Sequence, residues 1–150
     1  MRSGSACAIF LVFLISTTWA TDDPKAFFQK FIELGHTYNP EVAALYSDEA
    51  RIRAYRLYPH GTERTMEMNG AQWKQLVTAT LPLAKARRDK STFSNVTITK
   101  EGIGFRIKAD RYSELKCYTD TGYYLIVNPR EDGRLEIVEE YLETQPQSNC

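Results

Sequence analysis

The sequence predicts an α+β domain, in which three helices of the N-terminal half pack on one face of a curved antiparallel sheet. Two helix-like stretches precede the first predicted strand, and a third follows the second strand. From about residue 92 onward, the chain is a series of strands joined by turns that contain glycine, as in a β-meander. Residues 21–150 are enough for a single domain with a sizeable core.

The first twenty residues have the pattern of a secretory signal peptide. Arg2 supplies a positive start, residues 6–15 are mostly apolar, and Thr18-Trp19-Ala20 ends the segment with a small residue. The alternative, a membrane-spanning helix, needs about 20 apolar residues, which is longer than this run. We therefore expect cleavage after Ala20, a domain covering 21–150, and a secreted or periplasmic protein.

The charge balance excludes partners that are bound through a basic surface. Without Arg2, the chain has 18 basic and 19 acidic residues, so there is no basic excess to attract phosphates. We expect no nucleic-acid partner, and no membrane association once the signal peptide is removed.

Two cysteines, Cys117 and Cys150, follow the predicted signal peptide. In an oxidising compartment an even pair is a disulfide candidate, and a bridge would tie down a C-terminal tail that otherwise frays. The alternative is two free thiols, with one of them buried in a strand.

The helices of the N-terminal half are recognised by their starts. Asp22-Asp23-Pro24 begins a helix that ends at Gly35, and Asn39-Pro40 begins a second, short helix. Asn69-Gly70 begins a third helix, whose apolar residues recur at helical spacing on one face: Trp73, Leu76, Val77, Thr80, Leu81 and Ala84.

The strands are predicted from apolar alternation and from the turns between them. The first two cover about 50–58 and 64–68, between the second and third helices. Four more follow the third helix, at about 92–99, 103–118, 122–128 and 134–143.

This order of elements resembles the nuclear transport factor 2-like superfamily, which includes ketosteroid isomerase and the SnoaL-like polyketide cyclases. The segments that carry the resemblance are NPEVAALYSDEARI from Asn39, MNGAQW from Met68 and DGRLEIVEEYLE from Asp132. The resemblance implies a cone-shaped sheet with its helices on the concave face, and a pocket inside the cone. Members of the superfamily catalyse reactions, bind ligands or dimerise, so fold alone does not fix the function.

The catalytic residues of the isomerase are not matched in this sequence. Ala54 stands at the place of the carboxylate base, Phe31 at that of the phenol, and Tyr123 at that of the protonated acid. These departures argue against steroid isomerisation, although Tyr123 remains a candidate hydrogen-bond donor to a ligand oxygen.

Strand alternation predicts which polar side chains point inward. In 103–111 the odd residues form the apolar face, so Arg111 continues it; in the last strand, Glu139 and Tyr141 continue the face of Leu135 and Ile137. We expect Arg111 and Glu139 to form a buried pair with Tyr141 beside it. This pair is either a structural ion pair or the floor of a pocket. The alternative is that the side chains are exposed at the sheet edge. A β-bulge in either strand would reverse the assignment.

The segment IRAYRLYPHG places aromatic and basic residues at the end of a strand. Ile52 and Ala54 favour the even residues as the core face, which puts Tyr58 at the rim of the pocket. Tyr58 and His60 are candidates for ligand contacts, by stacking and by acid–base chemistry, or else they cover the sheet edge in solvent. His36 and His60 have no second ligand at metal spacing, so we expect no metal, and no phosphate-binding loop points to a cofactor.

Three functions are consistent with these observations. The first is a secreted small-molecule-binding domain, with ligand-binding candidates Arg111, Glu139, Tyr141, Tyr123, Tyr58 and His60. The second is a lyase, isomerase or cyclase that uses the same pocket. The third is a non-catalytic interaction module, whose sheet forms a homodimer.

Overall fold

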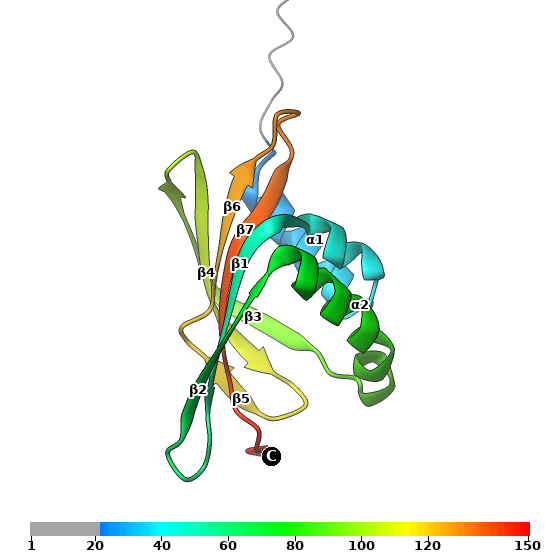
Figure 1. Cartoon of the computed structure of the whole chain (residues 1–150), viewed down its shortest axis with the longest axis vertical. Helices are drawn as coiled ribbons and strands as arrows, with labels where there is room; N and C mark the ends of the chain where they lie inside the picture. Colours follow the sequence, from blue (N-terminus) through cyan, green and yellow to red (C-terminus); the bar gives the residue numbers. More distant parts are fainter. Residues whose placement is uncertain (1–21) are drawn as a thin grey trace, which may run out of the picture.

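In the computed structural model, which describes residues 22–150, seven strands form one strongly curved sheet with helices on a single side (Figure 1). The predicted α+β fold is confirmed. The predicted signal peptide lies outside the described residues. None of the helices in the described part is both long and apolar enough to cross a bilayer.

Each predicted helix start is confirmed by a cap. In α1 (Pro24–His36) the Asp23 carboxylate accepts hydrogen bonds from two backbone N–H groups of the first turn, and Asn39 caps the 3₁₀ helix η1 (Pro40–Leu45). Asn69 and Gln72 form a reciprocal capping box at the start of α2 (Gly70–Arg87). The caps supply partners for N–H groups that the helices leave unpaired, so they fix where each helix begins.

The strands are β1 (Tyr46–Leu57), β2 (Glu63–Asn69), β3 (Ser91–Glu101), β4 (Gly104–Ser113), β5 (Tyr118–Asp120), β6 (Tyr124–Pro129) and β7 (Leu135–Thr144). Their order across the sheet is β2-β1-β7-β6-β4-β3, with β5 paired to β4. The β1–β7 pair is parallel and the others are antiparallel, so the sheet is mixed rather than wholly antiparallel.

The prediction of one strand over 103–118 is wrong. β4 ends at Ser113, and the backbone N–H of Cys117 donates a hydrogen bond to the Ser113 carbonyl at 2.8 Å. Cys117 has a left-handed backbone conformation, with φ of 52°. The chain therefore turns here and returns as β5, which pairs antiparallel with β4.

The predicted disulfide is confirmed. Cys117 and Cys150 are bonded, and their Cα atoms are 5.3 Å apart. The bridge holds the C-terminus against the turn between β4 and β5.

The core lies between α1 and the concave face of the sheet. Its buried members come from α1 and from the central strands: Phe27, Phe28, Tyr46, Ala50, Ile52, Ile107, Ala109, Tyr123, Leu125, Val127, Leu135 and Ile137. Alternation in β1 is as predicted, because Ile52 and Ala54 are both buried.

Helix α2 is packed differently from α1. Its single buried residue is Gly70 at its start. This position requires glycine, because a Cβ there would lie 1.7 Å from the backbone oxygen of Ser47. Its predicted apolar stripe is only partly covered, and Leu76 remains 39% exposed. In Figure 1, α1 and α2 lie on the same side of the sheet. Three residues of the α2 stripe, Trp73, Val77 and Leu81, line a cavity in this part of the protein.

Candidate functional site

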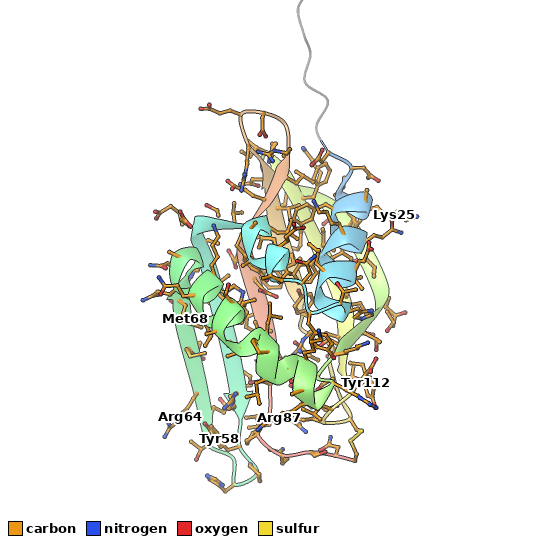
Figure 2. All side chains as sticks on the ribbon, turned by 90° about the vertical axis from the view of Figure 1, so that its right-hand side faces the viewer. Lys25, Tyr58, Arg64, Met68, Arg87 and Tyr112 are labelled. Atoms are coloured by element: carbon orange, nitrogen blue, oxygen red, sulfur yellow. A yellow bond between two sulfur atoms is a disulfide. The ribbon has the colours of Figure 1, made fainter. Side chains whose placement is uncertain are left out.

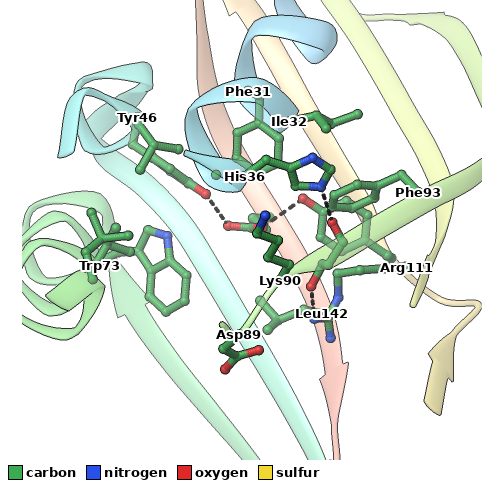
Figure 3. Close-up of a pocket in the computed structure, with 17 residues that line it drawn as sticks. Phe31, Ile32, His36, Tyr46, Trp73, Asp89, Lys90, Phe93, Arg111 and Leu142 are labelled. Carbon is green, nitrogen blue, oxygen red and sulfur yellow. Dashed lines mark hydrogen bonds between the residues drawn. The ribbon is translucent and has the colours of Figure 1, made fainter. Parts of the chain in front are cut away.

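A cavity of about 290 Å³ lies inside the cone, between the helices and the sheet (Figure 3). Its walls are mainly apolar and aromatic, with Phe31 from α1, Trp73 from α2 and Phe93 from β3. Phe31 and Phe93 also contact the core cluster. The cavity is close to the lower end of the volume range of small-molecule sites, roughly 300–1,000 Å³.

The polar lining of this cavity includes a buried carboxyl group. Glu140 on β7 is 4% exposed. Tyr46 donates a hydrogen bond to its Oε2 at 2.6 Å, and Tyr123 donates one to its Oε1 at 2.9 Å. Both tyrosines are also buried, so the three side chains form a desolvated cluster, which we call the inner cluster.

Burial sets the protonation of the inner cluster. It raises the pKa of Glu140, against the lowering effect of the hydrogen bonds from the two tyrosines. Burial and the negative charge of Glu140 raise the pKa of Tyr46 and Tyr123 well above the ordinary value. The phenols therefore remain donors, while burial favours the protonated form of the Glu140 carboxyl group by raising its pKa.

A β-bulge explains why Glu140, and not Glu139, points inward. Val127 pairs with Ile137 and Ile126 pairs with Glu139, so Val138 is the extra residue of β7. Beyond it the alternation is reversed, which places Glu139 and Tyr141 on the outer face. The predicted inward orientation of these two residues is wrong, for the reason that bulges change the face of all later side chains.

The predicted Arg111–Glu139 pair does not form. Arg111 is directed inward, as expected, and lines the cavity. Its Nε lies 3.5 Å from Asp120 Oδ2, and its Nη2 donates to the backbone oxygen of Glu143 at 2.8 Å. The carboxylate opposite Arg111 thus comes from β5, a strand that the sequence pattern does not separate from β4.

Glu139 has a different cation, on the outer face. Arg53 donates to Glu139 Oε1 at 2.9 Å, and Tyr124 donates to the same oxygen at 2.6 Å. The Tyr141 ring stacks on Tyr124, with ring centroids 5.6 Å apart. We call these four residues the outer cluster.

Tyr141 also donates a hydrogen bond to Glu143 at 3.1 Å. Partial burial and this bond raise the pKa of Tyr141 to about 12. Its phenol therefore stays protonated at neutral pH, on the side of the sheet away from the cavity.

The other predicted residues lie in two places. Tyr123 faces the cavity, as part of the inner cluster. Tyr58 lies on the concave side at the end of β1, where it lines a second hollow of about 730 Å³ between the β1–β2 hairpin and α2. His60 is exposed in the hairpin turn, with its ring centroid 6.0 Å from that of Tyr58.

The cavity and the second hollow, which we call the hairpin groove, adjoin one another. Trp73, Asp89 and Leu142 line both. The buried Nε1–H of Trp73 lies near the Tyr46 hydroxyl, whose pKa it lowers, but makes no well-formed hydrogen bond with any described residue. An unpaired buried donor at the junction of two hollows is a point at which a ligand oxygen would gain a hydrogen bond.

Sequence reasoning missed two residues of the inner cluster, Tyr46 and Glu140. Glu140 comes directly after Glu139, so only the unpredicted bulge decided between them. Tyr46 lies in the segment NPEVAALYSDEARI, where apolar spacing favours the short helix rather than the start of a strand. His36, for which the sequence analysis proposes no role because no second metal ligand lies at a suitable spacing, lines the cavity and bonds through Nε2 to the Ser91 carbonyl at 2.8 Å.

No family model matches this chain, and no curated protein matches it by sequence. Solved structures do match it by shape. A nuclear transport factor 2-like protein of unknown function from Shewanella baltica superposes with a TM-score of 0.56 at 12% identity, over 82% of this chain and 91% of that one. One from Pseudomonas putida gives 0.58 at 9% identity, over 79% and 82%.

The yeast UBP3-associated protein BRE5 gives a TM-score of 0.59 at 16% identity, over 79% of this chain and 90% of that one. At such low identity, these likenesses establish the fold and not an activity. The curled sheet, the helices on one side and the structural neighbours lead to one conclusion: the chain has the nuclear transport factor 2-like fold.

Proposed function

We propose that this protein binds a small molecule in the cavity of the cone. The single observation that carries the proposal is the inner cluster, a buried carboxyl group held by two tyrosines in the wall of a mainly apolar cavity that Arg111 also lines. Ligand sites typically combine apolar walls with a few convergent polar groups. A structural role alone would be served by apolar side chains, without the cost of burying a carboxyl group.

The state of α2 supports the same proposal. This helix leaves its apolar stripe partly uncovered above the cavity, and Trp73 presents an unpaired N–H there. A ligand of modest size would cover this apolar surface and supply the missing acceptor. A ligand could therefore bind against the cavity side of α2 while the sheet keeps its present conformation.

We also propose that binding takes place outside the reducing cytoplasm. The disulfide supports an oxidising compartment, in agreement with the predicted signal peptide. Native mass spectrometry of protein exported by its own host tests both points. We expect a polypeptide mass that begins at Thr21, and a bound compound that dissociates on denaturation. A chain that still begins at Met1 would contradict export.

Binding can be assigned to the cavity by intrinsic fluorescence. In a chain that begins at Thr21, Trp73 is the single tryptophan and lines the cavity. We expect the compound identified by mass spectrometry to change Trp73 emission. The variant Val77→Phe, which fills the cavity from α2, should weaken binding at least tenfold. Leu83→Phe is the matched control, because Leu83 is 51% exposed on the same helix and lines neither hollow. Equal affinity in both variants would exclude the cavity.

A second candidate is an enzyme that uses Glu140 as an acid or base. The raised pKa of Glu140 favours it, because perturbed carboxyl groups in clefts are typical of acid–base catalysis. Glu140→Gln should then retain ligand binding but stop the conversion of the bound compound into a product of different mass or structure. Conversion at an unchanged rate in Glu140→Gln would exclude this mechanism.

A further inference from the structure

Two arginines lie directly opposite one another on the concave face of the β1–β2 hairpin. Arg56 of β1 pairs in register with Arg64 of β2. On the same face, the preceding pairs are apolar: Ala54 with Met66, and Ile52 with Met68. Figure 2 shows Arg64 and Tyr58 on the projecting part of this hairpin, beyond Met68. The face therefore changes from apolar to doubly cationic toward the open end of the cone.

This pair of like charges is not neutralised by any carboxylate in the described part of the chain. In residues 22–150, neither arginine has a carboxylate within salt-bridge distance. Arg56 donates from Nε to Thr144 Oγ1 at 3.2 Å, and the Arg64 guanidinium lies 5.7 Å from the centroid of the Tyr58 ring. Like charges at directly opposed strand positions are destabilising. The other donors of both guanidinium groups remain available to an anion.

Both arginines line the hairpin groove, whose other walls combine apolar side chains with threonines. Met66 and Leu76 are 48% and 39% exposed there, and Trp73 and Leu142 connect the groove to the cone cavity. Among the described residues, Asp89 is the only carboxylate in the groove wall, and it comes from the segment after α2 rather than from the hairpin. A path lined by Trp73, Leu142 and Asp89 thus leads from the cavity of the inner cluster to a site with two cations.

We propose that the ligand is an amphipathic anion, with an apolar tail under α2 and a carboxylate, sulfate or phosphate head between Arg56 and Arg64. This inference rests on the proposed small-molecule function and specifies its ligand class. The planar guanidinium group presents paired N–H donors to such a head group, and the tail covers the apolar side chains that the protein leaves exposed. An anion between the two arginines also removes their repulsion.

The test compares probes that share one tail. Decanoate, decyl sulfate and decyltrimethylammonium, each below its micellar concentration, are titrated into the chain that begins at Thr21, with Trp73 emission and calorimetry as readouts. We expect both anions to bind at least tenfold more tightly than the cation. In Arg56→Gln/Arg64→Gln, affinity for the anions should fall about 10- to 100-fold, as for the loss of charge-assisted hydrogen bonds.

The matched control is Arg51→Gln/Lys108→Gln, which removes two charges from the outer face and should leave affinity unchanged. Folding is checked by the melting temperature without ligand. At low salt, Arg56→Gln/Arg64→Gln should melt no lower than the wild type, because the substitutions relieve a repulsion.

Each remaining outcome decides against the inference. Equal affinity for anionic and cationic probes, unchanged affinity in Arg56→Gln/Arg64→Gln, or no binding of any probe would overturn the anion assignment. Binding to phosphatidylglycerol vesicles with no response to decanoate would assign the arginine pair to a lipid surface instead. None of these results touches the proposed function, which fails separately if the exported protein carries no compound, or if Val77→Phe binds the carried compound as tightly as Leu83→Phe does.

Discussion

Glu139 and Glu140 are neighbours on β7, yet they belong to opposite sides of the sheet. Each accepts a hydrogen bond from a tyrosine at the start of β6, Glu139 from Tyr124 and Glu140 from Tyr123. On the outer face, the Glu139 carboxylate also pairs with a cation, Arg53, and is partly exposed to solvent. On the inner face, Glu140 accepts a hydrogen bond from a second tyrosine, Tyr46, and is almost fully buried. The same side chain is thus an ion-pair partner on one face and a desolvated acid on the other.

This contrast shows that environment, more than residue type, sets the chemistry of a carboxyl group. Hydrogen bonds from two phenols only partly offset the desolvation of Glu140, so its pKa is raised. Both clusters draw their residues from β1, from β7 and from the start of β6 or the residue directly before it, so equivalent substitutions in them form matched pairs. The difference within each pair then measures the effect of the environment.

Removing the carboxyl groups should give the largest difference. Glu140→Ala leaves two buried tyrosine hydroxyls without an acceptor, at a cost of about 1–3 kcal/mol each, so about 2–6 kcal/mol in the free energy of unfolding. Glu139→Ala breaks a partly exposed ion pair and should cost about 1 kcal/mol or less. Urea denaturation of both variants measures the difference. Equal losses would mean that the inner cluster is not desolvated.

Removing single phenol oxygens should give the same contrast on a smaller scale. Tyr123→Phe takes one of two donors from a buried carboxyl group and should lower the free energy of unfolding by about 1–3 kcal/mol. Tyr124→Phe should change it by less than about 1 kcal/mol, since water can replace the lost donor. A larger loss in Tyr124→Phe than in Tyr123→Phe, in the same urea experiment, would reverse our assignment of inside and outside.

The smallest effect is expected in the pH dependence of stability. The pKa of Glu140 in the folded protein is above its ordinary value of 4.5, so the folded state binds this proton more tightly than the unfolded state. The contribution of Glu140 to stability is therefore greatest at low pH and falls as pH rises from 4.5 through the raised pKa. Glu140→Gln cannot ionise, so its stability relative to the wild type should rise over this range.

The control for this measurement is Glu139→Gln, in which the Glu140 contribution is retained. Denaturation of the three proteins is compared at a series of pH values, beginning in mildly acidic buffer and extending to neutral pH. A stability difference between Glu140→Gln and the wild type that stays constant with pH would show that Glu140 does not titrate differently on folding.

Local sequence patterns are sufficient to predict most of the fold. Caps at Asp23, Asn39 and Asn69 mark the helix starts, and alternation at Ile52 and Ala54 indicates the correct core face of β1. These features depend on side chains and backbone groups a few residues apart. They can therefore be deduced without knowledge of which strands are neighbours.

The candidate site could be predicted only in part. Tyr123 and Arg111 lie inside the cone as expected, but Glu139 and Tyr141 do not, because one extra residue at Val138 changes the face of the residues after it. A bulge depends on pairing between β6 and β7 and leaves no clear mark in the alternation itself. The arginine pair of the hairpin groove is likewise a matter of register, since Arg56 and Arg64 become opposed only when β1 and β2 align.

The bridge between Cys117 and Cys150 closes a covalent ring around the strands that carry much of both clusters. β5, β6 and β7 all lie between the two cysteines in the chain, so Tyr123 and Glu140 are within this ring. One proteolytic cut in the turn at Asp132 and Gly133 would therefore leave two polypeptides that still migrate together without a reducing agent. A protein that meets extracellular proteases can be nicked at this turn and keep every residue of the inner cluster on the same molecule.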